Sequence, residues 1–350
     1  MNPPHLPAFL DSLLPRAVVA TKWIGLFIGL GTAGSLVGAE IQIDPAFPVY
    51  HPSAPLTAKF TTIGSDSLVE EMKLWAALLH ASQPGVVIDI QPKGSDKAAQ
   101  SLIDGTSQFA YAGRTMPQNE IAEITKAWGY PPLRILVSGA DLTKKTTTHP
   151  QVVWVNAKNP LSGLTLTQVD AIFSATRRRG GAKAITTWGE LGLGGEWANA
   201  PIHKFALNST GGPGIYLTET VLLNGEWNEG VKQIREEKVV PEAVALDPYA
   251  IGLTGLPYGT PQVRALALAV TDDATFFLPT DSNVINRSYP LSRFNYLYLR
   301  KEPGKPLDPA IRELLRVILS RQGQEAALQC HYLPLTSEML LQELALINGM

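Results

Sequence analysis

The chain has 350 residues, of which 45% are hydrophobic and 17% are charged. This composition excludes an intrinsically disordered chain and is sufficient for the cores of two domains. The 29 Lys and Arg residues nearly balance the 31 Asp and Glu residues, giving a net charge of −2. Nothing in this balance calls for nucleic acid or an anionic membrane surface as a partner.

The cysteine and histidine content bears on cofactors and catalysis. Cys330 is the single cysteine, which rules out an intramolecular disulfide and a multi-cysteine metal site. The six histidines lack the paired spacing of a metal site, and none has a recognisable nucleophile or carboxylate partner. No Gly-x-Ser-x-Gly motif is present. We therefore expect no cofactor, no bound metal and no enzymatic activity.

The N-terminal region has the features of a secretory signal peptide. Arg16 and Lys22 precede a glycine-rich apolar stretch that ends in Val37-Gly38-Ala39. This stretch is short for a permanent membrane span, which needs about 20 residues, and the small residues at its end are typical of a cleavage site. We predict that residues 1–39 form a signal peptide that is cleaved after Ala39. An uncleaved anchor is the alternative.

After a proline-rich entry segment, predicted strands and helices alternate along the chain. Short apolar runs indicate strands, and apolar residues at the helical period indicate helices. The predicted strands are residues 58–63, 86–91, 109–112 and 133–138, and the predicted helices are residues 67–82, 97–103 and 119–128. Such alternation is typical of a mainly parallel sheet with helices on both faces. Ligands of these sheets bind at the carboxyl ends of the strands.

Two loops that combine glycine with hydroxyl side chains follow the first two of these strands, at residues 64–67 and 94–95. Each precedes a helix whose first N–H groups are unpaired, an arrangement that attracts anions. The third strand ends just before Arg114, whose planar guanidinium matches a tetrahedral oxyanion. Together these features predict an oxyanion pocket. Ser and Asp are also common helix caps, and Arg114 could instead form an internal salt bridge or lie on the surface.

A second unit is predicted downstream, beginning with a strand at residues 151–156 that could cross between two domains. Further strands are predicted at residues 202–207, 250–254 and 289–299, and further helices at residues 167–173, 215–223 and 311–320. A third loop, residues 208–214, is again rich in glycine and hydroxyl groups and precedes a helix. It is therefore a third candidate for contact with an anion.

Short motifs along the chain, each weak alone, form a fairly specific set in their order and spacing. They are Gly-Ser-Asp-Ser-Leu at 64–68, Gly-Ser at 94–95, Ala-Gly-Arg-Thr-Met-Pro at 112–117, Asn-Pro-Leu at 159–161, Trp-Gly-Glu-Leu at 188–191, Ile-Gly-Leu-Thr-Gly at 251–255, Tyr-Pro-Leu at 289–291 and Leu-Ser-Arg-Gln-Gly-Gln at 319–324. In this set the chain resembles the periplasmic phosphate-binding proteins of bacterial ABC transporters. The resemblance spans most of the mature chain, from Lys59 to Leu346.

The resemblance implies an α/β protein with the two-lobed type II periplasmic-binding-protein fold. Each lobe would be a mainly parallel sheet flanked by helices, with the ligand between the lobes. Lobe I would comprise residues 40–155 and 261–350, and lobe II residues 156–260. The family further implies a periplasmic monomer, without nucleic acid, that passes phosphate or a similar oxyanion to an ABC transporter permease. The residues implied to contact the anion are Ser65, Asp66, Ser67, Ser95, Arg114, Asn208, Ser209 and Thr210.

The third loop departs from the family pattern. Relatives usually have an Arg followed by Ser-Gly-Thr in this loop, whereas this chain has Leu207 and then Gly-Pro-Gly at residues 212–214. The hydroxyl and amide groups of residues 208–210 could compensate.

Asp66 has two interpretations. As an ionised carboxylate it could accept a hydrogen bond from a protonated phosphate and so exclude sulfate, which carries no proton. Alternatively it is only a helix cap. For the whole protein, the alternatives to an oxyanion receptor are a surface or interaction protein with a degenerate cleft and a secreted hydrolase.

Overall fold

A computed structural model describes residues 41–209 and 211–349. Nearly all of these residues, from Ile43 onwards, form one compact unit. The predicted signal peptide and Thr210 lie outside the described residues. Within the described part of the chain, no helix has both the length and the apolar character needed to cross a membrane.

The first lobe is built on a five-stranded sheet with the order β2-β1-β3-β12-β4. Its strands are β1 (Thr57–Gly64), β2 (Gly85–Pro92), β3 (Phe109–Ala112), β4 (Leu133–Gly139) and β12 (Phe294–Leu299). Strand β1 pairs in parallel with both β2 and β3, so these three strands end at the same edge. Strand β12 is antiparallel to β3 and β4.

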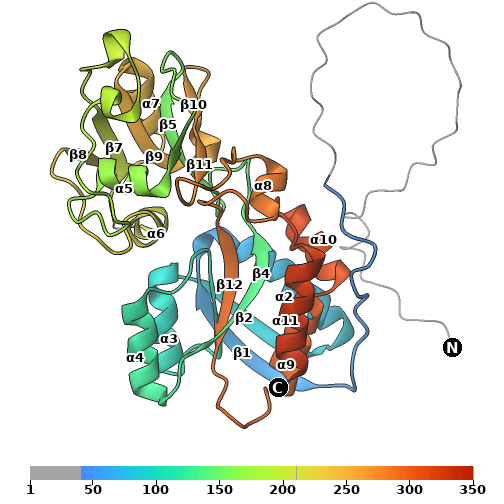
Figure 1. Cartoon of the computed structure of the whole chain (residues 1–350). Helices are drawn as coiled ribbons and strands as arrows, with labels where there is room; N and C mark the ends of the chain where they lie inside the picture. Colours follow the sequence, from blue (N-terminus) through green and yellow to red (C-terminus); the bar gives the residue numbers. More distant parts are fainter. Residues whose placement is uncertain (1–40, 210, 350) are drawn as a thin grey trace, which may run out of the picture. The chain divides into compact units, whose positions relative to one another are not determined.

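Helices cover both faces of this first sheet (Figure 1). They are α2 (Val69–Ser82), α3 (Ala98–Ile103), α4 (Gln118–Trp128), α9 (Pro309–Ile318), α10 (Arg321–Gln329) and α11 (Ser337–Asn348). Every residue of β3 is buried, and alternate side chains enter different cores. Phe109 and Tyr111 pack with α2 and α9, whereas Ala110 and Ala112 pack with α3 and α4. A continuously apolar strand is what a sheet buried on both faces requires.

The second lobe is built on another five-stranded sheet, with the order β10-β5-β9-β7-β8. Its strands are β5 (Gln151–Asn156), β7 (His203–Leu207), β8 (Val231–Ile234), β9 (Ala250–Gly255) and β10 (Val263–Ala265). The helices of this lobe are α5 (Leu166–Phe173), α6 (Gly212–Thr220) and α7 (Val239–Leu246). Strands β6 (Gly163–Thr165) and β11 (Ala267–Ala269) form a separate pair, which α8 (Asp281–Ile285) follows.

Each large sheet has four strands that run in the same direction and one antiparallel strand, which agrees with the expectation of mainly parallel sheets; the antiparallel strand is β12 in the first sheet and β5 in the second. In the second sheet, β7 is parallel to β8 and β9, whereas β5 is antiparallel to β9 and β10. The antiparallel strands β5 and β12 are the first strands of each sheet after the chain arrives from the other lobe. Neighbouring strands become parallel when a helical crossover returns the chain to the same edge of the sheet. Strands β5 and β12 enter their sheets from the other lobe and not through such a crossover.

The chain passes between the lobes twice, and the two crossings lie side by side. The first crossing runs from the end of β4 to the start of β5, and the second from the end of β11 to the start of β12. The N–H of Gln151 donates to the carbonyl of Leu291 at 3.2 Å, and the Tyr289 hydroxyl donates to the carbonyl of Gln151 at 3.2 Å. Strands β5 and β10 both pair within the second sheet, and the lobe boundaries at residues 155 and 261 stay a prediction.

The N-terminal strap, residues 43–53, is held on the first lobe against α9 and α10. Phe47 is buried in the core, and the carbonyl of Pro48 accepts a hydrogen bond from the N–H of Arg321 at 2.8 Å. The Tyr50 hydroxyl donates to the Glu313 carboxylate at 2.7 Å. The strap thus joins the start of the compact unit to helices from the end of the chain.

Candidate functional site

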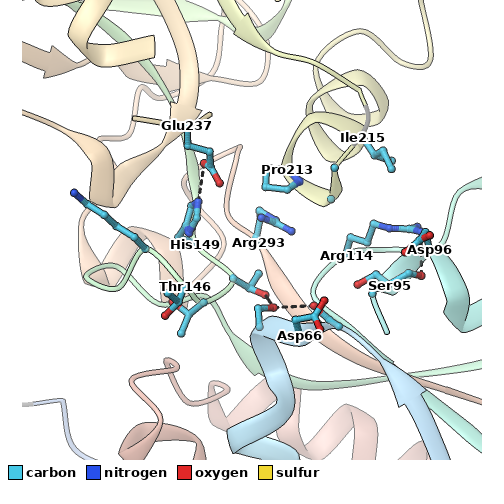
Figure 2. A pocket seen from close by; sticks show the side chains of 18 residues that line it. Asp66, Ser95, Asp96, Arg114, Thr146, His149, Pro213, Ile215, Glu237 and Arg293 are labelled. Carbon is cyan, nitrogen blue, oxygen red and sulfur yellow. Dashed lines mark hydrogen bonds and ion pairs between the residues drawn. The ribbon is translucent and has the colours of Figure 1, made fainter. Parts of the chain in front are cut away.

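The carboxyl ends of β1, β2 and β3 meet at one cavity of about 340 Å³. The turn after β1 brings Ser65, Asp66 and Ser67 to the cavity, the turn after β2 brings Ser95, and the end of β3 brings Arg114 (Figure 2). The remaining wall comes from the two crossings and from the first turn of α6. Five of the eight residues predicted from the sequence are thus brought together, although their contact with a ligand stays a prediction.

The serine hydroxyls are not used as helix caps. The turns are short 3-10 helices, Asp66–Leu68 and Ser95–Lys97, and neither has a side-chain cap hydrogen bond. Instead, the Ser65 and Ser67 hydroxyls lie 2.8 Å apart, and the Ser67 hydroxyl lies 3.1 Å from that of Thr148. A Cβ atom on Gly113 would lie 2.2 Å from the Thr148 hydroxyl oxygen. This position therefore has to be glycine for the hydroxyl groups to gather beside the cavity.

Arg114 is both a wall of the cavity and a member of an internal ion pair. Its side chain is 2% exposed, and Nη2 lies 2.6 Å from a carboxylate oxygen of Glu120 at the start of α4. Nη2 also donates to the carbonyl of Ser95 at 3.3 Å, and Nη1 donates to that of Thr115 at 3.0 Å. Glu120 compensates the charge of Arg114 and fixes its orientation. Because a guanidinium has five N–H donors, others remain for a ligand.

Arg293 is the main cavity residue that the sequence reasoning missed. It lies on the second crossing just before β12, and its side chain is 5% exposed. Nη2 donates to the carbonyl of Gly113 at 2.6 Å, and the guanidinium lies 5.3 Å from the centre of the Tyr216 ring. Burial lowers the pKa of Arg293 from its ordinary value. The sequence signal was its position in Tyr-Pro-Leu-Ser-Arg, directly before an apolar strand.

A histidine–carboxylate pair forms another wall of the cavity, contrary to the expectation that no histidine has a carboxylate partner. Nε2 of His149 lies 2.9 Å from a carboxylate oxygen of Glu237, which also accepts from Thr254 and from the N–H of Gly255 (Figure 2). Burial acts to raise the pKa of Glu237. The hydrogen bond from His149 and the charges of His149 and Arg293 outweigh it, leaving this pKa lowered. Glu237 therefore remains an ionised hydrogen-bond acceptor.

The third loop borders the cavity mainly with glycine and proline residues, which offer no polar side chain. Gly211, Gly212 and Pro213 line the cavity, and α6 begins at Gly212 rather than at the predicted Ile215. Asn208 lines an adjoining cavity of about 220 Å³. The Ser209 hydroxyl lies 2.8 Å from that of Thr218 and accepts from the indole N–H of Trp227. Asn208 and Ser209 are thus outside the main cavity, and the contribution of Thr210 stays a prediction.

Asp66 occupies the first position of the 3-10 turn after β1, whereas Ser65 is the cap residue. The Asp66 carboxylate is exposed and faces the cavity. The described residues include no group of three or more His, Cys, Asp or Glu side chains that could hold a metal ion. The polar side chains that line the cavity carry hydroxyls, guanidinium groups, carboxylates, the ammonium group of Lys145 and the imidazole of His149.

Two joined α/β sheets with a polar cavity at their strand ends define a binding protein for a small polar ligand. A family model described as a PBP superfamily domain matches residues 50–322. The phosphate-binding protein PstS of Pseudomonas aeruginosa is 35% identical over 336 residues, covering 95% of this chain and 99% of that protein. The chain therefore belongs to the PBP superfamily and, within it, to the family of PstS phosphate-binding proteins.

Solved structures are similar in fold. PstS from Borrelia burgdorferi has a TM-score of 0.58 at 13% identity, over 80% of this chain and 99% of that chain. An ABC-type phosphate transport receptor from Vibrio cholerae has a TM-score of 0.55 at 18% identity, over 78% of this chain and 99% of that chain. These likenesses confirm the predicted two-lobed α/β fold class.

Proposed function

We propose that this protein is a periplasmic receptor that binds phosphate, or a similar tetrahedral oxyanion, and delivers it to an ABC transporter. The observation that carries the proposal is the convergence of Arg114 with the hydroxyls of Ser65, Ser67 and Ser95 on one cavity. The relatives' names support the choice of ligand, since the Pseudomonas aeruginosa relative is a phosphate-binding protein and the Vibrio cholerae structure is a phosphate transport receptor.

The cavity has the donors that an oxyanion requires. Guanidinium groups give short, charge-assisted hydrogen bonds to anionic oxygens, and their planar geometry permits two bonds to one ligand. The serine hydroxyls donate further hydrogen bonds without adding net charge. We propose that a bound oxyanion replaces the water that otherwise solvates these groups, with Ser65, Ser67, Ser95 and Arg114 as direct contacts.

The carboxylates would define which oxyanion binds. Asp66 and Glu237 both border the cavity, and an ionised carboxylate accepts hydrogen bonds but cannot donate them. A ligand that retains a proton at neutral pH, such as hydrogen phosphate, can donate to such a group. Sulfate would bring an unprotonated oxygen against the negative charge. We propose that Asp66 makes this distinction, because no hydrogen bond within the described residues already occupies its carboxylate.

We propose that the protein reaches the periplasm through removal of residues 1–39. The basic residues, the short apolar stretch and the small residues before Glu40 support this assignment. Mass spectrometry of the exported protein should give a mature form that begins at Glu40. A mature form that retains Met1 would show instead that the segment is kept as an anchor.

A receptor fits the cavity better than a hydrolase. Nε2 of His149 pairs with Glu237, and Nδ1 is buried with no hydrogen-bond partner, so a hydrolase would need a nucleophile at Nδ1. Among the described residues, no serine or threonine hydroxyl makes a hydrogen bond to His149, as an activated nucleophile would. The cavity also favours a receptor over an interaction protein with a degenerate cleft. Nε of Arg293 is buried at this cavity with no hydrogen-bond partner, and a bound ligand would supply that partner.

The proposal is tested by calorimetric titration of the purified mature protein with phosphate and with sulfate. We expect saturable binding of phosphate with one site per chain and much weaker binding of sulfate. A parallel assay with p-nitrophenyl phosphate should show no turnover. Absence of binding to either anion would contradict the proposal and favour an interaction protein, and turnover of the ester would favour a hydrolase.

A further inference from the structure

Arg293 differs from Arg114 in how its charge is balanced. Burying a charge is costly unless another charge and hydrogen bonds compensate it. Arg114 has Glu120 at 2.6 Å, whereas the ion pairs of the described residues do not include Arg293. The carboxylate of Glu237 is near enough to affect Arg293 electrostatically, but it is already held by His149, Thr254 and Gly255.

The guanidinium of Arg293 also has unused donors. Nη2 donates to the carbonyl of Gly113 at 2.6 Å, while the buried Nε has no hydrogen-bond partner. A guanidinium has five N–H groups in a planar fork, so a ligand could take two parallel hydrogen bonds from Arg293. Figure 2 shows the side chain of Arg293 pointing into the cavity between His149 and Arg114.

A second positive feature lies beside this guanidinium. Helix α6, Gly212–Thr220, begins at the cavity, and Gly211, Gly212 and Pro213 line the wall there. A Cβ atom on Gly212 would lie 4.0 Å from Nη2 of Arg293, so the first turn of α6 and the guanidinium are neighbours. The N-terminus of a helix carries a partial positive charge that favours anions.

We propose that Arg293, whose guanidinium lies beside the first turn of α6, is a direct ligand contact and supplies positive charge that holds the anion in this cavity. The proposal rests on the proposed function. The ligand class is a tetrahedral oxyanion with at least one full negative charge, placed between Arg293 and the serine hydroxyls of the first lobe. Arg114, already neutralised by Glu120, then contributes orientation more than charge.

Arg293 is also placed to connect ligand binding with the arrangement of the two lobes. Its side chain contacts Gly113 in the first lobe and the ring of Tyr216 on α6 in the second. The Tyr216 hydroxyl donates to the carbonyl of Ser292, the residue before Arg293, at 2.8 Å. An anion held by Arg293 would therefore contact a group fastened to both lobes and to the crossing between them.

The test compares Arg293→Gln and Arg293→Lys with the wild type by phosphate calorimetry and thermal unfolding. We expect Arg293→Gln to weaken phosphate binding about 30-fold or more, as expected for loss of one partner of a desolvated charged contact. Arg293→Lys keeps the charge but loses the fork, so its loss should be smaller. Without phosphate, Arg293→Gln should unfold at the wild-type temperature or above it, because an uncompensated buried charge has been removed.

Arg287→Gln is the matched control. Arg287 lies on the same crossing and stacks on the ring of Phe294 at 4.4 Å, but it is exposed and does not line the cavity. The phosphate affinity of Arg287→Gln should stay within about twofold of the wild-type affinity, since surface substitutions away from a site have small effects.

Three outcomes would overturn the assignment. Wild-type affinity in folded Arg293→Gln, whatever its unfolding temperature, would show that Arg293 is structural. If Arg293→Gln does not fold, then salt-insensitive phosphate binding by the wild type would refute the charge assignment. Failure of the wild type to bind any oxyanion would refute the proposed function itself, which the first two outcomes leave intact.

Discussion

Arg114 shows how one side chain can satisfy both interpretations that its sequence position allows. It is an internal salt-bridge residue through Glu120 and a cavity residue through its remaining donors. We predict that Arg114→Ala weakens phosphate binding by about 2–5 kcal/mol, the usual cost of removing one partner of a buried, charged hydrogen bond. Calorimetry measures this loss. Arg134→Ala, which removes an exposed arginine of the same lobe, is the control.

The ion pair has a separate effect on stability. Arg114→Ala leaves the Glu120 carboxylate without its partner, and one Glu120 oxygen is already buried with no hydrogen bond. Arg114→Ala should therefore also lower the unfolding temperature, and a second change, Glu120→Gln, should restore it without restoring affinity. Full affinity in the folded single variant would place Arg114 outside the binding contacts.

Asp66 gives a prediction about selectivity rather than affinity. Its carboxylate is exposed at the cavity and caps no helix in this structure. We predict that Asp66→Asn reduces the preference for phosphate over sulfate more than it reduces phosphate affinity, because the amide can donate to an unprotonated oxygen. Competition binding with both anions measures the ratio. Equal affinity of the wild type for both anions would leave Asp66 without this role.

Whether a cavity residue could be predicted from the sequence depends on the element that carries it. Ser65, Asp66, Ser67, Ser95 and Arg114 could be predicted as neighbours because each follows a parallel strand of one sheet, and parallel strands end at a common edge. His149 and Glu237 come from the first crossing and the second lobe and have no local sequence pattern, whereas Arg293 has only its place directly before an apolar strand. Their proximity depends on long-range packing, which a single sequence does not reveal.

At the scale of elements, α2 contains a buried acidic side chain. Glu71 is fully buried, and burial raises its pKa to about 8. The nearby Ser138 hydroxyl partly opposes this rise. Neither carboxylate oxygen has a well-oriented hydrogen bond. The folded protein therefore keeps a proton that the unfolded chain releases near pH 4.5. Stability must fall as the pH rises from about 4.5 towards about 8, because the native state binds more protons than the unfolded state.

We predict that Glu71→Gln removes this part of the pH dependence. The amide has a similar shape and no charge, so the variant should gain stability over the wild type at pH 8 and little at pH 5. Thermal unfolding of both proteins across this range measures the difference and cancels the titration of unrelated groups. A constant difference in unfolding temperature at all pH values would show that Glu71 does not titrate in this interval.

Most predicted elements of the first lobe are confirmed within a few residues, since their apolar periodicity is strong. The predicted strand at residues 109–112 matches β3, and the helix at residues 119–128 matches α4 apart from its first residue. The predicted strand at residues 289–299 is wrong in its first half, because only Phe294–Leu299 is extended in a sheet. Residues 289–293, Tyr-Pro-Leu-Ser-Arg, directly adjoin this apolar strand but belong to a crossing, and the sequence pattern does not mark where the strand begins.

For the whole molecule, two neighbouring crossings permit a hinge. A few residues in each can absorb a rotation without repacking either core, and Gln151 joins the two crossings through Leu291 and Tyr289. We predict that saturating phosphate decreases the radius of gyration measured by small-angle X-ray scattering, because the anion contacts groups from both lobes. Identical radii with and without phosphate, under conditions where calorimetry shows saturation, would contradict closure.

The N-terminal strap limits where the proposed signal peptide could be removed without damage to the folded unit. A cut after Ala39 leaves residues 40–43 ahead of Asp44, whose carboxylate accepts a hydrogen bond from Ser337. A cut beyond Phe47 would remove a ring that is 4% exposed in the core, and loss of a buried phenylalanine typically costs about 3–5 kcal/mol. If residues 1–39 are removed as proposed, the position of the cut also determines the stability of the protein that is released.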